Sequence, residues 1–527
     1  MVLSIYLLLS PYSSVIAKLN HPTKENGYES IEMWLLITAV MITISGFTAN
    51  TAKAQSNEKI RKIERFVEEQ KNKSKIPGIA LVIVERGKVV YQKGFGYADV
   101  KKKSPVTAHT LFEIGSTTKA FTGLAILQLE KEGLLKRSED VRKYIPWLKL
   151  KYKGKQQKIT LNQLLHHTSG IASSSITQIP ESQASNALEL TVKTLLNQPL
   201  DRKPGSSFEY ATINYDVLGR VIEVITKQPY DVYVKRQVLE QAGMNESKVG
   251  LHQHSLFEMA SGYKIGFMRA QAYTPPVYRG NVPAGYVISN ATDLAKWLNL
   301  QLGRSSGHGI DKQIIQESHI PDQTVKPFDK DTYYAGGWDV MRKKGEKYIA
   351  HSGNNPTFSS YLIIRPDDQL GVAILSNMNS DSTSYIGKGV MDLWQGSNVT
   401  HHYSDSYQML DQIVTFLTVA IGCFSMLFLL LSFKIMRKLV RKQRMGVTLS
   451  TKRLSLLIIH TLIVVAIFVM ILFPKLLSKW MSRDFINVWG PTSITVLFYS
   501  ITVASILYYG LGLLLIFTAK KKLDSAV

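Results

Sequence analysis

The sequence predicts an α+β domain, in which an antiparallel sheet is flanked by helices and joined by a helical subdomain, followed by an α-helical membrane anchor. Two observations predict the domain: strand-like apolar runs occur at 78–91 and again at 337–375, and residues 120–300 between them follow a mostly helical pattern. Strands at both ends with helices between them are typical of a sheet assembled from the two ends of one domain. The third observation is a set of three long uncharged runs after residue 407, each long enough to cross a bilayer.

A chain of 527 residues is long for one domain, so two or more structural parts are expected. No internal repeat is visible. We divide the chain into an N-terminal extension with a signal segment (1–54), the α+β domain (55–395), a polar linker (396–407), three membrane spans (408–519) and a basic tail (520–527).

The N-terminal part contains a signal-like segment at residues 33–54. Its apolar core is followed by small residues in the small-x-small pattern of a secretory cleavage site, which predicts cleavage after Ala54. A second apolar stretch, residues 1–17, precedes it. Two interpretations stay open: the true start is Met33, or the part that begins at Met1 forms a further span.

Within the domain, a charged helical segment reaches to about residue 73. Apolar residues 78–84 and 89–91 flank a polar turn, which predicts a β-hairpin. A second block of strands and a final helix to about residue 395 close the domain. The strands of this block are expected at 337–340, 348–350, 359–364 and 371–375, with a turn at 365–369 between the last two.

The three apolar runs, 408–433, 454–474 and 491–518, predict membrane-spanning helices. The single cysteine, Cys423, lies in the first run, so no intrachain disulfide is possible and its thiol is expected to serve packing. His460, near the start of the second run, is expected at the membrane interface and not in a proton relay.

The positive charges around these spans predict their orientation. Because basic residues favour the cytoplasmic side, we expect a multi-pass protein of the cell membrane whose α+β domain is extracytoplasmic. The basic loop after the first span carries Lys434, Arg437, Lys438, Arg441, Lys442, Arg444, Lys452 and Arg453, and the tail carries Lys520, Lys521 and Lys522.

The formal charge of +23 comes from 63 basic against 40 acidic residues. Basic runs in the soluble part, such as residues 149–158, raise the question of nucleic acid binding. No aromatic platform, zinc-ligand spacing or recognition-helix pattern accompanies them, so we expect no nucleic acid partner. A solvated face near anionic lipid or wall polymer explains the charge better.

The most informative motif is Ser116-Thr-Thr-Lys119, between an extended apolar run and a long helical pattern. A serine hydroxyl is a poor nucleophile without a base within hydrogen-bond reach. Residues i and i+3 share one helix face, so the Lys119 amine is expected beside Ser116, with its pKa lowered by burial. Ser56 and Ser261 have the same spacing to a lysine without this context.

Other segments complete a candidate site. Tyr210 follows Pro-Gly-x-x-Phe on a loop before a helical pattern, and His351-Ser352-Gly353 stands at the end of an expected strand. The runs 161–171 (LNQLLHHTSGI) and 284–297 (AGYVISNATDLAKW) are the remaining motifs.

In these five motifs and their order, residues from about 60 to 395 resemble the serine β-lactamase and penicillin-binding protein family, in its class C-like branch. The resemblance implies a β-lactamase/DD-peptidase-like fold in which Ser116 attacks a carbonyl and forms an acyl-enzyme. It implies that Lys119 and Tyr210 share the proton transfer, and which of them is the acylation base stays open. The backbone N–H groups of Ser116 and Asn354 would form the oxyanion hole. For Tyr210 to act as a base, its pKa must fall strongly, and we expect the charge of Lys119 to lower it.

The chain departs from the β-lactamase pattern at two substrate-binding positions. His351-Ser352-Gly353 replaces Lys-Thr-Gly, and a histidine is only partly charged near neutrality. In Tyr210-Ala-Thr212 a threonine hydroxyl replaces the amide that contacts the substrate's acylamide. Both changes argue against an efficient β-lactamase.

Several polar residues are expected to serve structure. His166 and His167 have no carboxylate at metal-ligand spacing, so we expect no metal site there and no cofactor. Asp293 is expected to cap or anchor the start of a helix.

Together these features predict a membrane-anchored serine hydrolase that cleaves amide or ester bonds next to a D-amino acid, in a cell-wall peptide or an N-acyl-D-amino-acid prodrug leader. The order of a signal segment, an external domain and three membrane spans is similar to the architecture of the prodrug-activating D-amino-acid peptidases. The alternative is a penicillin-binding sensor or β-lactamase, although the cytoplasmic loop is too short for a signalling domain. The expected partners are a small peptide or peptidoglycan-type substrate and, through the three helices, membrane lipid. A transporter is disfavoured, because the spans carry no charge to mark a pathway.

Overall fold

The computed structural model describes residues 57–521, except 251–258, 305–308, 344, 400–402, 474–475 and 477–481. The predicted extension and signal segment lie outside the described residues, as does the tail from residue 522. The described residues from 66 onward belong to one compact unit.

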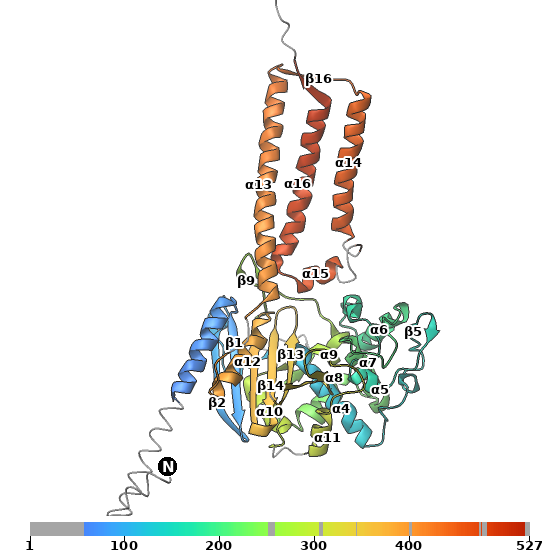
Figure 1. Cartoon of the computed structure of the whole chain (residues 1–527), viewed down its shortest axis with the longest axis vertical. Helices are drawn as coiled ribbons and strands as arrows, with labels where there is room; N and C mark the ends of the chain where they lie inside the picture. Colours follow the sequence, from blue (N-terminus) through green and yellow to red (C-terminus); the bar gives the residue numbers. More distant parts are fainter. Residues whose placement is uncertain are drawn as a thin grey trace, which may run out of the picture. The chain divides into compact units, whose positions relative to one another are not determined.

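An eight-stranded antiparallel sheet forms the centre of the α+β domain, in the order β11-β12-β13-β14-β15-β1-β2-β3. The N-terminal strand β1 pairs with the C-terminal strand β15, with Ile79 opposite Ser376. In Figure 1 the blue β1 and β2 accordingly belong to the same sheet as the yellow-orange β13 and β14. This confirms the predicted assembly from both ends of the domain. The strands are β1 (Gly78–Glu85), β2 (Lys88–Asp99), β3 (Ser104–Pro105), β11 (Thr332–Tyr334), β12 (Asp339–Lys343), β13 (Glu346–Asn354), β14 (Ser359–Arg365) and β15 (Leu370–Ser376).

Helices and loops make up most of the sequence between the two strand blocks, as predicted, but several short strands lie there as well. Their apolar faces and one face of the sheet share a core, in which the ring of Phe121 stacks on Trp297 with centroids 3.9 Å apart. A further helix spans residues 57–73. The helices of the domain are α4 (Lys119–Lys131), α5 (Leu161–Leu165), α6 (Ala187–Lys193), α7 (Ile213–Thr226), α8 (Tyr230–Val234), α9 (Val282–Gly285), α10 (Ala291–Gln301), α11 (Lys312–Ser318) and α12 (Ser382–Trp394).

Helices α10 and α12 cover opposite faces of the sheet. Gly371 of β15 faces Leu298 of α10, whereas Gly387 of α12 lies against Tyr361, which pairs with Ile374 of β15. Side chains alternate along a strand, so positions 371 and 374 point to opposite faces. The sheet is therefore buried on both sides, which explains its nearly continuous apolar strands.

Several short strand pairs of the domain escaped the sequence analysis, and one of them is a hairpin in the predicted helical region. It consists of β8 (Tyr263–Gly266) and β9 (Arg269–Ala272), joined by Phe267 and Met268 with φ angles of 52° and 59°. Two-residue hairpin turns of this shape usually contain Asn-Gly. Two bulky residues give no such signal, so the turn was not recognised.

Three helices are long and apolar enough to cross a membrane, as predicted: α13 (Ser406–Val440), α14 (Thr451–Leu472) and α16 (Thr492–Phe517). α13 is longer than its apolar run and continues into the basic loop. A short helix, α15 (Arg483–Trp489), precedes α16. At the other end, β16 (Arg444–Gly446) of the basic loop pairs with β17 (Thr518–Lys520) of the tail, so the two predicted cytoplasmic segments lie together.

Candidate active site

Ser116 lies in the short 3-10 helix η2 (Gly115–Thr118), directly before α4. Gly115 has a φ of 55°, and a Cβ atom there would approach the backbone nitrogen of Asn354 to 2.5 Å. A Cβ on Gly353 would come within 2.0 Å of the Ile114 carbonyl oxygen. Only glycine fits at these two positions, which bring the end of β13 against the serine.

Lys119 is the first residue of α4, and its amine lies beside the serine as the spacing predicts. Its Nζ donates to Ser116 Oγ at 3.0 Å, to Thr212 Oγ1 at 3.1 Å and to the Ala284 carbonyl oxygen at 2.8 Å. These acceptors come from η2, the start of α7 and α9. The lysine side chain is fully buried, whereas Ser116 is partly exposed.

Burial lowers the pKa of Lys119 to about 7, although the negative charge of Asp216 acts in the opposite direction. A lysine with this pKa is largely unprotonated just above neutral pH, and an unprotonated amine can accept a proton from a hydroxyl. The expectation of a lowered lysine pKa is confirmed.

Asp216 was not found in the sequence analysis. It is fully buried in α7, one helical turn after Thr212, so both residues lie on one helix face. With its amide nitrogen turned toward the carboxylate, Asn281 donates to the two oxygens of Asp216 at 2.9 and 3.1 Å. This pair connects α7 to the segment that leads into α9, and the i, i+4 spacing from Thr212 was the signal available in the sequence.

Tyr210 lies on the loop before α7, as predicted, with its ring partly exposed and its hydroxyl buried. Lys119 Nζ is 5.0 Å from the centre of its ring. Burial raises the pKa of the Tyr210 hydroxyl, and the neighbouring Ser116 lowers it by less. Among the described residues, this hydroxyl has no hydrogen-bond partner. The expectation that this pKa is lowered is therefore wrong. Removal of the phenol from water raises the pKa by more than the neighbouring groups lower it.

The His167 ring packs 4.4 Å from the Tyr210 ring and 4.6 Å from the Tyr334 ring, measured between centroids. Its Nδ1 accepts from Asn214 Nδ2 at 2.9 Å, and burial holds the pKa of His167 well below its usual value. His166 contacts the Asn162 carbonyl at 2.9 Å. Both rings are bound by neighbouring protein groups. The part of the chain that the structure describes contains no group of three side chains that could hold a metal ion.

His351, Ser352 and Gly353 lie in β13, near its end. His351 is buried: its Nδ1 contacts the Ser352 carbonyl oxygen at 2.6 Å, and its Nε2 contacts the Tyr334 hydroxyl at 3.0 Å. Burial, followed by the charge of Lys119, lowers the pKa of His351 to about 3. The expectation that this histidine is partly charged near neutrality is therefore wrong, and the imidazole is neutral.

The remaining predicted site residues divide into buried and accessible ones. Thr212 is buried, and its hydroxyl is occupied by Lys119. Ser352 is exposed, and Asn354 is partly exposed with its backbone nitrogen next to Gly115.

Two further polar contacts support the site without having been predicted. Glu113 is buried, which raises its pKa to about 7, and Asn355 Nδ2 donates to its Oε2 at 2.6 Å. The same amide donates to the Gly285 carbonyl oxygen at 2.9 Å. It thereby joins the segment after β13 to the segment before η2 and to α9. Asp293, by contrast, anchors the start of α10 by accepting from the backbone N–H of Ser247 at 2.8 Å.

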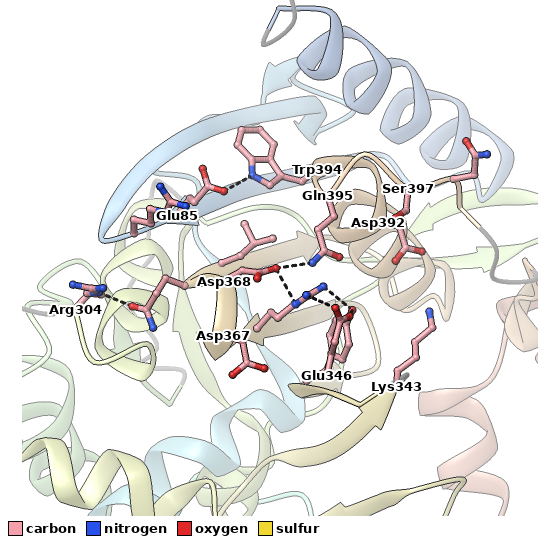
Figure 2. Close-up of a pocket in the computed structure, with 16 residues that line it drawn as sticks. Glu85, Arg304, Lys343, Glu346, Asp367, Asp368, Asp392, Trp394, Gln395 and Ser397 are labelled. Atoms are coloured by element: carbon pink, nitrogen blue, oxygen red, sulfur yellow. Dashed lines mark hydrogen bonds and ion pairs between the residues drawn. The ribbon is translucent and has the colours of Figure 1, made fainter. Parts of the chain in front are cut away.

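A cavity of about 1030 Å³ lies at the opposite end of the sheet from Ser116, between the β14–β15 turn and the end of α12. Figure 2 shows ion pairs between some of its charged side chains, whereas Glu85 accepts a hydrogen bond from Trp394. Arg365 binds Glu346 and Asp368, and Gln395 Nε2 donates to Asp368 at 3.0 Å. It shares no residue with the candidate site.

Comparison with known proteins shows the family to which the chain belongs. The Beta-lactamase family matches residues 63–388. Protein flp of Staphylococcus aureus (strain MRSA252) is 32% identical over 450 residues, covering 83% of this chain and 87% of that protein. N-acetylmuramyl-L-alanine amidase of Bacillus subtilis (strain 168) is 26% identical over 406 residues, covering 65% of this chain and 90% of that protein. The octameric penicillin-binding protein homologue from Pyrococcus abyssi is a structural neighbour with a TM-score of 0.57 and 29% identity, covering 67% of this chain and 81% of that chain. The chain therefore belongs to the β-lactamase family of serine hydrolases and penicillin-binding proteins.

Proposed function

We propose that this protein is a membrane-anchored serine hydrolase that forms an acyl-enzyme at Ser116. One observation carries the proposal: a fully buried lysine amine lies within hydrogen-bond distance, 3.0 Å, of the hydroxyl of an accessible serine. Two further acceptors hold that amine in place. A nucleophile within hydrogen-bond reach of an oriented base is the arrangement that covalent catalysis requires.

In the first half of the reaction, unprotonated Lys119 takes the proton of the Ser116 hydroxyl while Oγ attacks the carbonyl carbon of the substrate. Collapse of the tetrahedral intermediate breaks the amide or ester bond, and Lys119 and Tyr210 return a proton to the departing amine or alkoxide. Water then attacks the acyl-enzyme and loses its proton to the same groups, which releases the acid and restores Ser116. The lowered pKa of Lys119 and the raised pKa of Tyr210 favour the lysine as the acylation base.

The backbone N–H groups of Ser116 and Asn354 form the oxyanion hole in this proposal. The approach of Asn354 to Gly115, which only a glycine permits, supports it. Donors aimed at the developing negative charge lower such a barrier by about 3 kcal/mol.

The proposed substrates contain an amide or ester bond next to a D-amino acid, in a cell-wall peptide or an N-acyl-D-amino-acid leader. A neutral His351 supplies no fixed positive charge for the carboxylate of a bicyclic β-lactam. The Thr212 hydroxyl accepts a hydrogen bond from Lys119, so it is not directed at the acylamide of such a substrate. The similarity to a protein that is named N-acetylmuramyl-L-alanine amidase supports a substrate from the cell wall. A penicillin-binding sensor or β-lactamase is the alternative, which the similarity to a penicillin-binding protein homologue supports.

The proposed location is the cell membrane, with the hydrolase domain extracytoplasmic and α13, α14 and α16 as spans. The pairing of the basic loop with the tail supports a common cytoplasmic side for both.

The first prediction tests the nucleophile. A fluorophosphonate or a fluorescent penicillin should label the purified protein at Ser116, and Ser116→Ala should abolish labelling while the thermal unfolding temperature stays nearly unchanged, because a cleft hydroxyl contributes little to stability. Ser206→Ala, at an exposed loop position, is the matched control and should label normally. Persistent labelling of Ser116→Ala, measured by gel fluorescence, would contradict the assignment.

The second prediction concerns pH. Because the base is the unprotonated form of a lysine with a pKa of about 7, kcat/KM should rise as pH increases through about 7 and level off above it. Burial holds the pKa of Asp216 well above its usual value, and in its ionised form this carboxylate raises the pKa of Lys119. Asp216→Asn should therefore move this rise to lower pH. Asp329→Asn, on the surface, should leave it in place. If kcat/KM of Asp216→Asn rises at the same pH as in the unsubstituted protein, the charge of Asp216 does not act on Lys119.

The third prediction concerns topology. Residues 396–398 are exposed, so protease added to intact cells should release a soluble hydrolase fragment that ends there. Immunoblotting against the domain reports the fragment. Release only after permeabilisation would place the domain on the cytoplasmic side.

The fourth prediction concerns the substrate. Loss of one contact to a substrate group typically costs about 1–3 kcal/mol, or roughly ten- to a hundred-fold in rate. We therefore expect negligible hydrolysis of cephalosporins and measurable cleavage of N-acyl-D-Asn or D-Ala peptides, but not of their L-isomers. Lys119→Ala and Tyr210→Phe should each reduce that cleavage strongly and by similar factors, because members of one proton-transfer unit are not additive. Chromatography of the products measures both reactions. Fast cephalosporin turnover without D-peptide cleavage would favour the β-lactamase alternative.

A further inference from the structure

The end of the sheet that carries the site is connected to the start of α13. Asn354 pairs with Ser359 across β13 and β14. The Ser359 hydroxyl contacts the Thr383 hydroxyl at 2.7 Å in the first turn of α12. The neighbouring Ser382 donates at 3.0 Å to Asp405, whose side chain caps the N-terminus of α13. The end of β13 and the start of β14, with the loop between them, form the wall of the site. This wall is therefore joined to the first membrane-length helix through a few buried hydrogen bonds.

A second connection runs through the hairpin of β8 and β9. The backbone N–H groups of Phe267 and Met268, at its tip, donate to Asp411 of α13 at 3.0 and 2.7 Å. The Ser493 hydroxyl of α16 donates to the same carboxylate at 2.6 Å, and Asp411 is fully buried. Both tip residues have positive φ angles, which non-glycine residues avoid. The carboxylate stabilises that turn by accepting both of its N–H groups.

The base of this hairpin contacts the wall of the site. Gly262 lies against Thr357 and Phe358, in the loop that follows β13, so closely that a Cβ atom would be 2.5 Å from Thr357 Oγ1. Within the hairpin, the buried Lys264 donates to the Asn487 carbonyl oxygen of α15 at 2.7 Å. A four-residue strand spans about 13 Å. The base of the hairpin contacts the wall of the site and its tip binds Asp411. The wall and Asp411 are therefore separated by the length of the hairpin, about 13 Å.

Asp411 stands at the boundary of the apolar part of α13. Residues 412–433, which follow it, contain no charged side chain, and Lys434 comes next. At 1.5 Å per residue this segment is about 33 Å long, close to the thickness of the hydrocarbon core of a bilayer. Ser493 lies in the first turn of α16, at the same level. The hairpin tip is therefore bound where the two helices enter the membrane.

We propose that Ser116 acts on substrates that stay anchored in the outer leaflet by a hydrophobic group, with the scissile bond roughly 20 Å or less from the anchor. The proposal rests on the proposed function of Ser116 and names its substrate class. The two connections hold the site at one height above the lipid. A soluble domain on a free linker would instead reach bonds at many heights. The bond broken is the same amide or ester, and water supplies the hydroxyl of the released acid and the proton of the leaving group.

The test uses the full chain in phosphatidylglycerol vesicles, with a fluorogenic N-acyl-D-alanyl amide joined to a palmitoyl chain through a stiff polyproline spacer. Such spacers extend about 3.1 Å per residue. We expect a five-residue spacer, about 16 Å long, to give a rate at least tenfold higher than a fifteen-residue spacer, about 47 Å long. Asp411→Ala should reduce this preference to about twofold or less, while cleavage of a soluble D-alanyl amide changes less than about twofold.

Two variants keep the test decisive. Ser493→Ala removes one of the three hydrogen bonds to Asp411 and should weaken the spacer preference partially, even where Asp411→Ala lowers protein yield. Asp367→Ala, an exposed carboxylate on the β14–β15 turn, is the matched control and should keep the full preference. Equal rates with both spacers in the unsubstituted protein would overturn the proposal, as would a preference that survives in both junction variants. Absence of soluble-substrate cleavage and of Ser116 labelling would instead reject the proposed function itself.

Discussion

The position of the Lys119 amine is the constraint on which the rest of the site depends. Its acceptors come from η2, from the start of α7 and from α9, so three elements must be placed correctly for one nitrogen. The Asp216–Asn281 pair joins two of these elements, and Asn355 joins the third to the end of β13. The core behind them, in which Phe121 of α4 stacks on Trp297 of α10, supplies the rigidity that such a placement needs.

Removal from water sets the charge state of the whole site. It lowers the pKa of Lys119 to about 7, lowers the pKa of His351 to about 3 and raises the pKa of Tyr210. A neutral lysine is a base, a protonated tyrosine is a proton donor, and a neutral histidine leaves the substrate side without a fixed cation. Burial, as the largest cause of each shift, thus gives different charge states to groups that the motifs only bring together.

The same end of the sheet carries the candidate active site and the contacts to α13. Gly115 and Gly353 let β13 approach η2, while the next turns of the chain connect to Asp405 and, through the β8–β9 hairpin, to Asp411. Buried carboxylates bound by backbone N–H groups and hydroxyls are strong and directional connections. In the membrane arrangement that we propose, these connections would fix the height of the site above the bilayer.

The sequence by itself determined the sheet built from both ends of the domain, the three membrane-length helices and the pairing of Ser116 with Lys119. These are local or periodic features, which apolar patterns and i, i+3 spacing encode directly. It also placed Tyr210 on its loop before α7. Only the tertiary structure decided the charge states of Tyr210 and His351, because desolvation depends on packing from elements distant in the chain. It alone revealed Asp216, Asn281 and the hairpin bound to Asp411, since their partners lie far apart in the sequence and the hairpin turn contains Phe267 and Met268, where a turn signal would require asparagine and glycine.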